Sequence, residues 1–98
     1  MARLVVYFDR NKVGHYDFDE GQVRVGRHPD SDIFLPHQAV SRLQITLVKQ
    51  GASWSVENAG GRNAVFVNGS VMKAPTPLGE DDRIEFGRYI IRFLLNPG

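Results

Sequence analysis

The chain has 98 residues, 42% of them hydrophobic and 23% charged, which is typical of one small globular domain and not of a disordered segment. Twelve lysines and arginines face eleven acidic residues, and the resulting net charge of +1 excludes a strong overall field toward nucleic acid or an anionic membrane. Cysteine is absent, which excludes disulfides and thiolate metal sites. Any anion-binding site must therefore be local.

The two ends of the sequence fit a single domain over residues 1–98. The first apolar run meets charge at Asp9 and is too short for a membrane span or a secretory signal. The Pro97-Gly98 pair after the last apolar run is typical of a domain edge, so we interpret the chain as one module of a longer protein. We expect it in the cytoplasm, although the lack of cysteine alone does not separate cytoplasm from periplasm.

In chain order, apolar residues come in short runs rich in Val, Ile, Phe and Tyr, separated by clusters of Gly, Asn, Asp and Pro. This pattern indicates many short strands and no long amphipathic helix. The predicted strands span residues 3–8, 14–18, 22–26, 33–35, 43–49, 53–58, 65–67, 83–86 and 89–95. So many short strands at close spacing predict an all-β fold, a β-sandwich of two sheets with antiparallel or mixed strands.

Alternation is clearest in strand 43–49. It puts Leu43, Ile45 and Leu47 on one face, which we predict to be core, and Gln44 on the other face. Trp54 in the next strand is predicted to be core as well. Tight reversals are predicted at 50–51, 68–69 and 86–89, because the Gly and Asn residues there tolerate positive φ.

Three polar loops, at 27–32, 36–42 and 58–63, each contain an arginine. Functional residues often lie on loops that a rigid scaffold carries. Guanidinium, hydroxyl and amide groups are the donors that a phosphate with a flanking peptide backbone requires. The candidate residues with these groups are Arg27, Ser41, Arg42, Arg62 and Asn63. Spacing alone does not separate such a site from solvated surface arginines.

The order of further motifs along the chain favours a binding site over solvated surface arginines. They are Val25-Gly26-Arg27, Asp32-Ile33-Phe34-Leu35-Pro36, Val40-Ser41-Arg42, Trp54-Ser55-Val56-Glu57-Asn58, Arg62-Asn63, Phe66-Val67-Asn68-Gly69, Leu78-Gly79-Glu80-Asp81-Asp82-Arg83-Ile84 and Phe86-Gly87. Together they resemble forkhead-associated (FHA) domains over most of the chain. The resemblance implies an FHA/SMAD-like β-sandwich whose loops at one end bind a phosphothreonine-containing protein or peptide. It implies an adaptor without catalytic activity, cofactor or small-molecule substrate.

The resemblance also implies a role for each candidate residue. Arg27 would grip the phosphate, and Ser41 would donate a hydroxyl hydrogen bond to it. Arg42 would add charge-assisted contacts to the phosphate or the peptide main chain. Asn63 would hold the peptide backbone, and Arg62 lies where its side chain would reach the phosphate or the residues after it.

Two departures from the family pattern favour an alternative. Three residues after the serine the family usually has a histidine that braces the binding loops, and here Gln44 stands at that position. Where the family often reads Ser-x-Asn-Gly-Thr, the chain reads Gly61-Arg62-Asn63-Ala64-Val65. The first alternative is therefore a degenerate domain of the same fold that docks a protein without phosphate.

A second alternative is a small β-barrel that binds single-stranded nucleic acid through stacking aromatics and a basic groove. The low net charge and the core-like placement of the aromatic residues argue against it, and we expect no nucleic-acid partner.

Metal binding and hydrolysis are not predicted. The three histidines, His15, His28 and His37, lie on separate elements without acidic partners at ligand spacing, and we expect them at the surface. The acidic residues Asp30, Asp32, Glu80, Asp81 and Asp82 fall in turns. Ser41 has no histidine and acid partners suggested by spacing, so we expect no nucleophilic catalysis.

Overall fold

A computed structural model of the chain describes residues 1–19 and 21–95, so the Pro97-Gly98 pair lies outside the described residues. The described part forms eleven strands. They are β1 (Ala2–Phe8), β2 (Asn11–Phe18), β3 (Gln22–Gly26), β4 (Ile33–Phe34), β5 (Ile45–Gln50), β6 (Ser53–Asn58), β7 (Phe66–Val67), β8 (Ser70–Val71), β9 (Thr76–Leu78), β10 (Asp82–Phe86) and β11 (Tyr89–Leu95). Among these residues there is no helix long and apolar enough to span a membrane.

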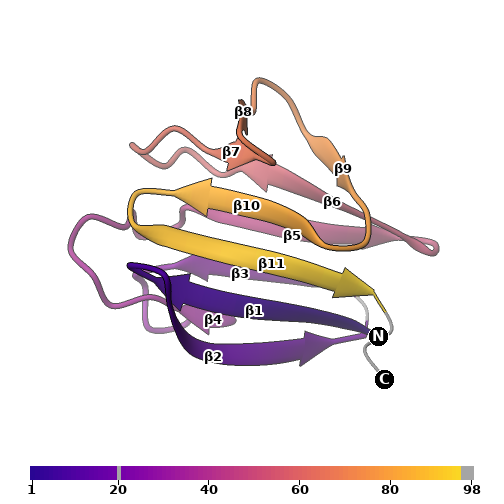
Figure 1. Cartoon of the computed structure of the whole chain (residues 1–98), viewed down its shortest axis with the longest axis horizontal. Helices are drawn as coiled ribbons and strands as arrows, with labels where there is room; N and C mark the ends of the chain where they lie inside the picture. Colours follow the sequence, from indigo (N-terminus) through magenta and orange to yellow (C-terminus); the bar gives the residue numbers. More distant parts are fainter. Residues whose placement is uncertain (20, 96–98) are drawn as a thin grey trace.

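The strands form two sheets (Figure 1). One has six strands in the order β2-β1-β11-β10-β7-β8, and the other has five in the order β4-β3-β5-β6-β9. All pairings are antiparallel except that of β3 with β4. The predicted all-β sandwich of two sheets is confirmed. The sheets do not close into a barrel, so the β-barrel alternative is wrong.

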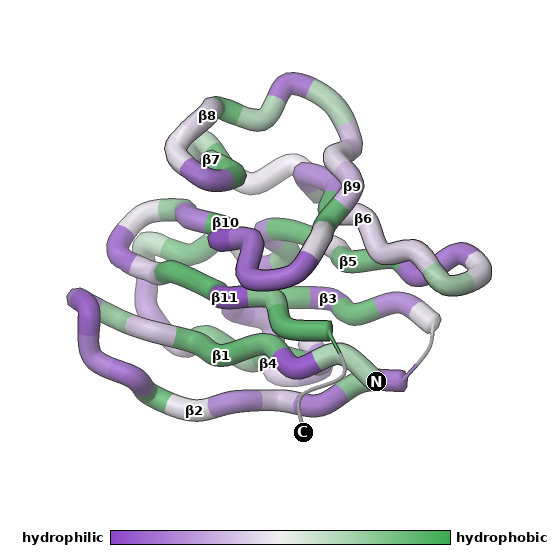
Figure 2. The backbone as a smooth tube through the Cα atoms, turned by 45° about the vertical axis from the view of Figure 1, so that its right-hand side comes forward, coloured by the Kyte–Doolittle hydropathy of each residue, from purple (hydrophilic) through white to green (hydrophobic). Residues whose placement is uncertain are grey.

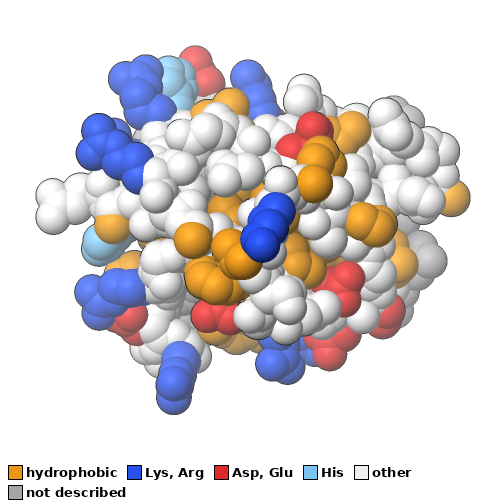
Figure 3. Space-filling model, turned by 90° about the horizontal axis from the view of Figure 1, so that it is seen from above, with side chains coloured by type: hydrophobic (Ala, Val, Ile, Leu, Met, Phe, Trp, Pro, Cys, Tyr) orange, Lys and Arg blue, Asp and Glu red, His pale blue; other side chains and the backbone are white. Residues whose placement is uncertain are grey.

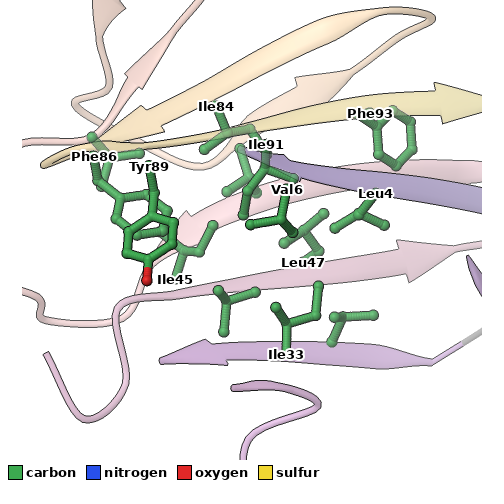
Figure 4. Packing of buried hydrophobic residues seen from close by; sticks show 14 of the residues in the cluster. Leu4, Val6, Ile33, Ile45, Leu47, Ile84, Phe86, Tyr89, Ile91 and Phe93 are labelled. Carbon is green, nitrogen blue, oxygen red and sulfur yellow. The ribbon is translucent and has the colours of Figure 1, made fainter. Parts of the chain in front are cut away.

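Alternation along the strands builds the core between the sheets. In β1, Leu4 and Val6 are fully buried, and in β11 the residues Ile91 and Phe93 are. Figure 4 shows side chains of β1, β10 and β11 pointing toward those of the second sheet. In Figure 2 the hydrophobic residues follow these inner strands, whereas the edge strand β2 is mostly hydrophilic. Trp54 is buried, as predicted, and its ring meets that of Phe93 at a centroid distance of 6.1 Å.

The nine predicted strands are all present, and two strands were not predicted. β8 and β9 have two and three residues, too few for alternation to show in the sequence. Leu43 was predicted to face the core, which is wrong: it is 37% exposed, because β5 begins at Ile45 and residue 43 still belongs to the preceding loop. The fully buried residue of that loop is Gln44.

The predicted reversals are confirmed. Asn68 and Gly69, between β7 and β8, have φ values of 51° and 85°. Positive φ at both turn residues matches the right-handed twist of the two strands in a two-residue hairpin. Gly51 and Gly87 also have positive φ, at 63° and 57°. Most of the turns and loops that matter below, including those after β3, β4 and β6, gather at the end of the sandwich that lies opposite the N-terminus, on the left in Figure 1.

Candidate functional site

Backbone hydrogen bonds extend the five-stranded sheet into the loops at this end. The N–H of Arg27 donates to the carbonyl of Ser41 at 3.0 Å, and that of His28 donates to the carbonyl of Arg42 at 3.1 Å. Residue 26 must be glycine for this approach, because an added Cβ would overlap the Arg42 carbonyl and lie 2.8 Å from its carbon. Arg27 is thereby held beside Ser41.

The five candidate residues predicted from the sequence line one surface hollow of about 660 Å³. They come from the loops after β3, β4 and β6, and they are Arg27, Ser41, Arg42, Arg62 and Asn63. Figure 3 shows Lys and Arg side chains gathering at this same left-hand end of the molecule. The structure therefore brings all five side chains together.

Arg27 has an exposed side chain that is nevertheless oriented. Its Nε donates to the carbonyl of Val40 at 3.0 Å. Within the described residues, no hydrogen bond or ion pair engages the two Nη groups. The guanidinium fork is thus fixed at one edge and open at the other, an arrangement suited to two oxygens of a phosphate.

Ser41 connects two of the loops. Its Oγ accepts a hydrogen bond from the backbone N–H of Arg62 at 3.0 Å. A hydroxyl that accepts this bond keeps its own proton for donation. Ser41 can therefore hold the β6–β7 loop and donate to an anion in the hollow at the same time.

Asn63 is held so that it offers an acceptor to the hollow, whereas Ser41 offers a donor. Its Nδ2 donates to the carbonyl of Ala39 at 2.9 Å and to Oε1 of Gln44 at 3.1 Å. Both amide hydrogens are used, so among the described residues Oδ1 is the part of the side chain left without a partner. Asn63 is set to accept a hydrogen bond, as from a peptide N–H.

Arg42 and Arg62 flank the hollow, and both are exposed. In the described part of the chain no carboxylate lies within ion-pairing distance of either guanidinium. The local field is positive even though the whole chain is nearly neutral. This positive field attracts anions.

Sequence reasoning missed the groups that orient these side chains. The carbonyls of Ala39 and Val40 carry no side-chain signal, so no pattern in the sequence could reveal them. His37 is half-buried, although it was expected at the surface: its ring lies 5.2 Å from that of Phe8, and its Nδ1 accepts from the N–H of Ala39 at 3.1 Å. It anchors the loop that carries Ser41.

No three His, Cys, Asp or Glu side chains of the described residues come together as metal ligands would. The site offers instead cationic forks, one hydroxyl proton and one amide oxygen. These groups are suited to an anion and a neighbouring main-chain donor, which is the chemistry of a binding module built on a β-sandwich.

The family follows from a comparison with known proteins. The model of the FHA domain matches residues 23–87, and the chain belongs to the FHA-domain family. It is similar to the glycogen accumulation regulator GarA of Mycolicibacterium smegmatis, with 32% identity over 98% of this chain and 60% of that protein. It is also similar to the oxoglutarate dehydrogenase inhibitor of Corynebacterium jeikeium, with 34% identity over 95% of this chain and 64% of that protein.

The chain spans less than two thirds of the length of these two relatives. Among solved structures, its fold is similar to that of Mycobacterium tuberculosis EmbR in complex with a low-affinity phosphopeptide. The TM-score is 0.86 at 23% identity, and the match covers 99% of this chain and 25% of that one. At this identity the likeness supports the fold.

Proposed function

We propose that the domain binds a phosphothreonine-containing peptide or protein in the hollow between Arg27, Ser41 and Asn63. It acts as an adaptor, a single domain over residues 1–98 that recruits a phosphorylated cytoplasmic partner and performs no chemistry of its own. The observation that carries the proposal is the open fork of Arg27, which pairs with no carboxylate of the described residues and lies beside a hydroxyl with a proton to donate. Arg42 and Arg62 add positive charge on either side.

In the proposed complex, each part of the ligand meets a different part of the site. Phosphate oxygens accept hydrogen bonds from the Nη groups of Arg27 and from Oγ of Ser41, and such charge-assisted bonds are the stronger kind. Oδ1 of Asn63 accepts from a main-chain N–H next to the phosphothreonine. The threonine γ-methyl lies against the apolar part of the lining, which includes Ala39 and Val40.

The comparisons support this proposal in two ways. The relatives named a regulator and an inhibitor fit a domain whose output is the activity of another protein. The EmbR complex has a phosphopeptide bound to a protein that shares this fold. From these two observations we propose that the partner of this chain is a protein that a Ser/Thr kinase has phosphorylated.

The degenerate-domain alternative rests on positions 44, 64 and 65. Val65 is 1% exposed, so its side chain belongs to the core and a hydroxyl there is not available to the hollow. Ala64 is exposed and contributes no polar group. In this alternative the domain would dock an unphosphorylated protein.

A matched pair of peptides separates the two functions. A peptide pool with one fixed phosphothreonine is screened first, and the best binder is then titrated calorimetrically beside its unphosphorylated twin. We expect heat of binding from the phosphorylated peptide alone. Equal affinities would overturn the proposal and favour the degenerate domain. As a control, Arg83→Ala removes an exposed arginine of β10, away from the hollow, and should leave the affinity unchanged.

A further inference from the structure

Gln44 lies beneath the hollow with a fully buried side chain. Its Oε1 accepts two hydrogen bonds, from the backbone N–H of Ser41 at 3.2 Å and from Nδ2 of Asn63 at 3.1 Å. Turning the amide by 180° would place an NH₂ group against these two donors, so the assignment of Oε1 is fixed. Asn63 is fixed in turn, because its NH₂ group faces the carbonyl of Ala39.

The other end of the Gln44 amide has an unusual environment. Nε2 is buried, and no hydrogen-bond partner for it exists among the described residues. It occupies the space over Gly61, where an added Cβ would lie 2.5 Å from Cδ of Gln44 and closer still to Nε2. A side chain at position 61 and a glutamine at position 44 therefore compete for one volume.

Gly61 has no conformational reason to be glycine. Its φ lies outside the left-handed region, unlike that of Gly60 at 96°. The end of a flexible side chain normally swings away from a new Cβ at low cost. Here the amide cannot swing without moving Oε1, which breaks the bonds to Ser41 and Asn63.

We propose that Gln44 and Gly61 are a matched pair, in which Gln44 is the positioning residue that presents Oδ1 of Asn63 to the ligand and Gly61 leaves room for it. The two departures from the family pattern then compensate for each other and do not signal a lost site. This inference rests on the proposed function for its effect on affinity. It also specifies the ligand, since the group that faces Asn63 must be a donor such as a main-chain N–H.

A double-mutant cycle in the whole 98-residue chain tests the pair. The variants are Gly61→Ala, Gln44→Ala and the two combined, each titrated with the phosphothreonine peptide selected above. In the wild-type background, Gly61→Ala should weaken binding about tenfold, as overpacking does. In the Gln44→Ala background the same substitution should change the affinity less than about twofold, because the competing amide is gone.

Gly60→Ala is the matched control. An added Cβ at position 60 meets no atom within 4 Å, and the positive φ alone makes the substitution unfavourable. Its effect should therefore be the same whether residue 44 is Gln or Ala. Equal effects of Gly61→Ala in the two backgrounds would overturn the matched pair.

A second readout needs no ligand. In ¹⁵N NMR spectra of the free protein, exchange of the Asn63 side-chain amide protons with water should be slow in the wild type and in Gly60→Ala. It should be faster in Gly61→Ala and in Gln44→Ala. Unchanged exchange in both of these variants would contradict the positioning role. If the wild type did not prefer the phosphorylated peptide, the proposed function would be wrong. The exchange rates of the free protein would still test whether Gln44 and Gly61 are a matched pair.

Discussion

Two groups of arginines, on different parts of the same small domain, show what separates a structural cation from a binding one. Three arginines of the six-stranded sheet and its turns donate to a carboxylate. The pairs are Arg3 with Asp17, Arg88 with Asp9, and Arg92 with Asp81. In the loops after β3, β4 and β6, the guanidinium groups of Arg27, Arg42 and Arg62 have no such partner within the described residues.

The contrast explains how a chain of net charge +1 can carry a phosphate site. Acidic residues pair with Arg3, Arg88 and Arg92, and among the described residues none pairs with the three arginines of the loops. An exposed pair contributes little to stability, so these paired arginines can be replaced at low cost. A guanidinium group that is oriented but not ion-paired adds no ion-pair stability to the fold, and its charge is available to a ligand. Four experiments test this division, in order of expected effect.

Arg27→Ala should have the largest effect. Removing one member of a desolvated charge pair with the phosphate costs roughly 2–5 kcal/mol. This corresponds to a loss of affinity of about 30-fold or more, which calorimetric titration with the phosphothreonine peptide measures. Circular dichroism should show an intact fold, because the side chain of Arg27 is exposed.

Arg92→Ala is the matched control from the sheet. Its guanidinium is already paired with Asp81, at 2.7 Å between Nε and Oδ1, and lies outside the hollow. The phosphopeptide affinity should not change. Comparable losses in Arg27→Ala and Arg92→Ala would contradict the division between the two groups and indicate a general electrostatic attraction.

Ser41→Ala should come second. The variant loses one hydrogen bond to a charged group, worth about 1.5–3 kcal/mol. The affinity should fall about ten- to hundredfold in the same titration. Ser53→Ala, in the exposed first residue of β6, should leave it unchanged. Wild-type affinity in folded Arg27→Ala and Ser41→Ala would show that the site is elsewhere.

The preference for phosphothreonine over phosphoserine should be smaller. Burying one methyl group is worth about 0.8 kcal/mol, and an empty methyl site loses packing contacts as well. Threonine should therefore win by roughly 1–2 kcal/mol, or about five- to thirtyfold. Two peptides that differ in this residue alone are compared at fixed salt and above about pH 7, where the phosphate is largely dianionic. Equal affinities would show that the site binds the phosphate but has no pocket for the threonine methyl group.

Much of the fold could be predicted from the sequence, because local patterns determine it. Alternation revealed the longer strands, and Asn68-Gly69 revealed a hairpin. β8 and β9 remained hidden because two or three residues show no period. Leu43 was misplaced because alternation does not reveal where a strand begins.

The sequence named residues that the fold brings into one hollow, but it did not reveal how their side chains are oriented there. The five residues chosen by residue type and motif order all belong to the lining of this hollow. The pairing state of an arginine depends on strand register: Arg3 lies directly opposite Asp17 in the β1–β2 ladder, and Arg88 meets Asp9 across 79 positions of the chain. The competition of Gln44 and Gly61 for one volume likewise appears only in three dimensions.

The smallest effect concerns the pairs of the sheet and their dependence on pH. The hydrogen bond from Arg3 lowers the pKa of Asp17, and that from Arg92 lowers the pKa of Asp81. A carboxyl group whose pKa is lower in the folded state contributes stability above its unfolded pKa, about 3.9 for Asp. This contribution is lost as the pH falls through the lower, folded value.

Asp17→Asn, which removes the charge and keeps the shape, should therefore be slightly less stable than the wild type at about pH 7. The difference in the free energy of unfolding, measured by urea titration, should shrink as the pH falls below about 3.9. High salt should reduce the difference at neutral pH, because the pair is exposed. The phosphopeptide affinity should be the same in both proteins at about pH 7, since Asp17 belongs to the sheet and not to the hollow. A change in affinity without a change in stability would reverse the roles assigned to the two groups of arginines.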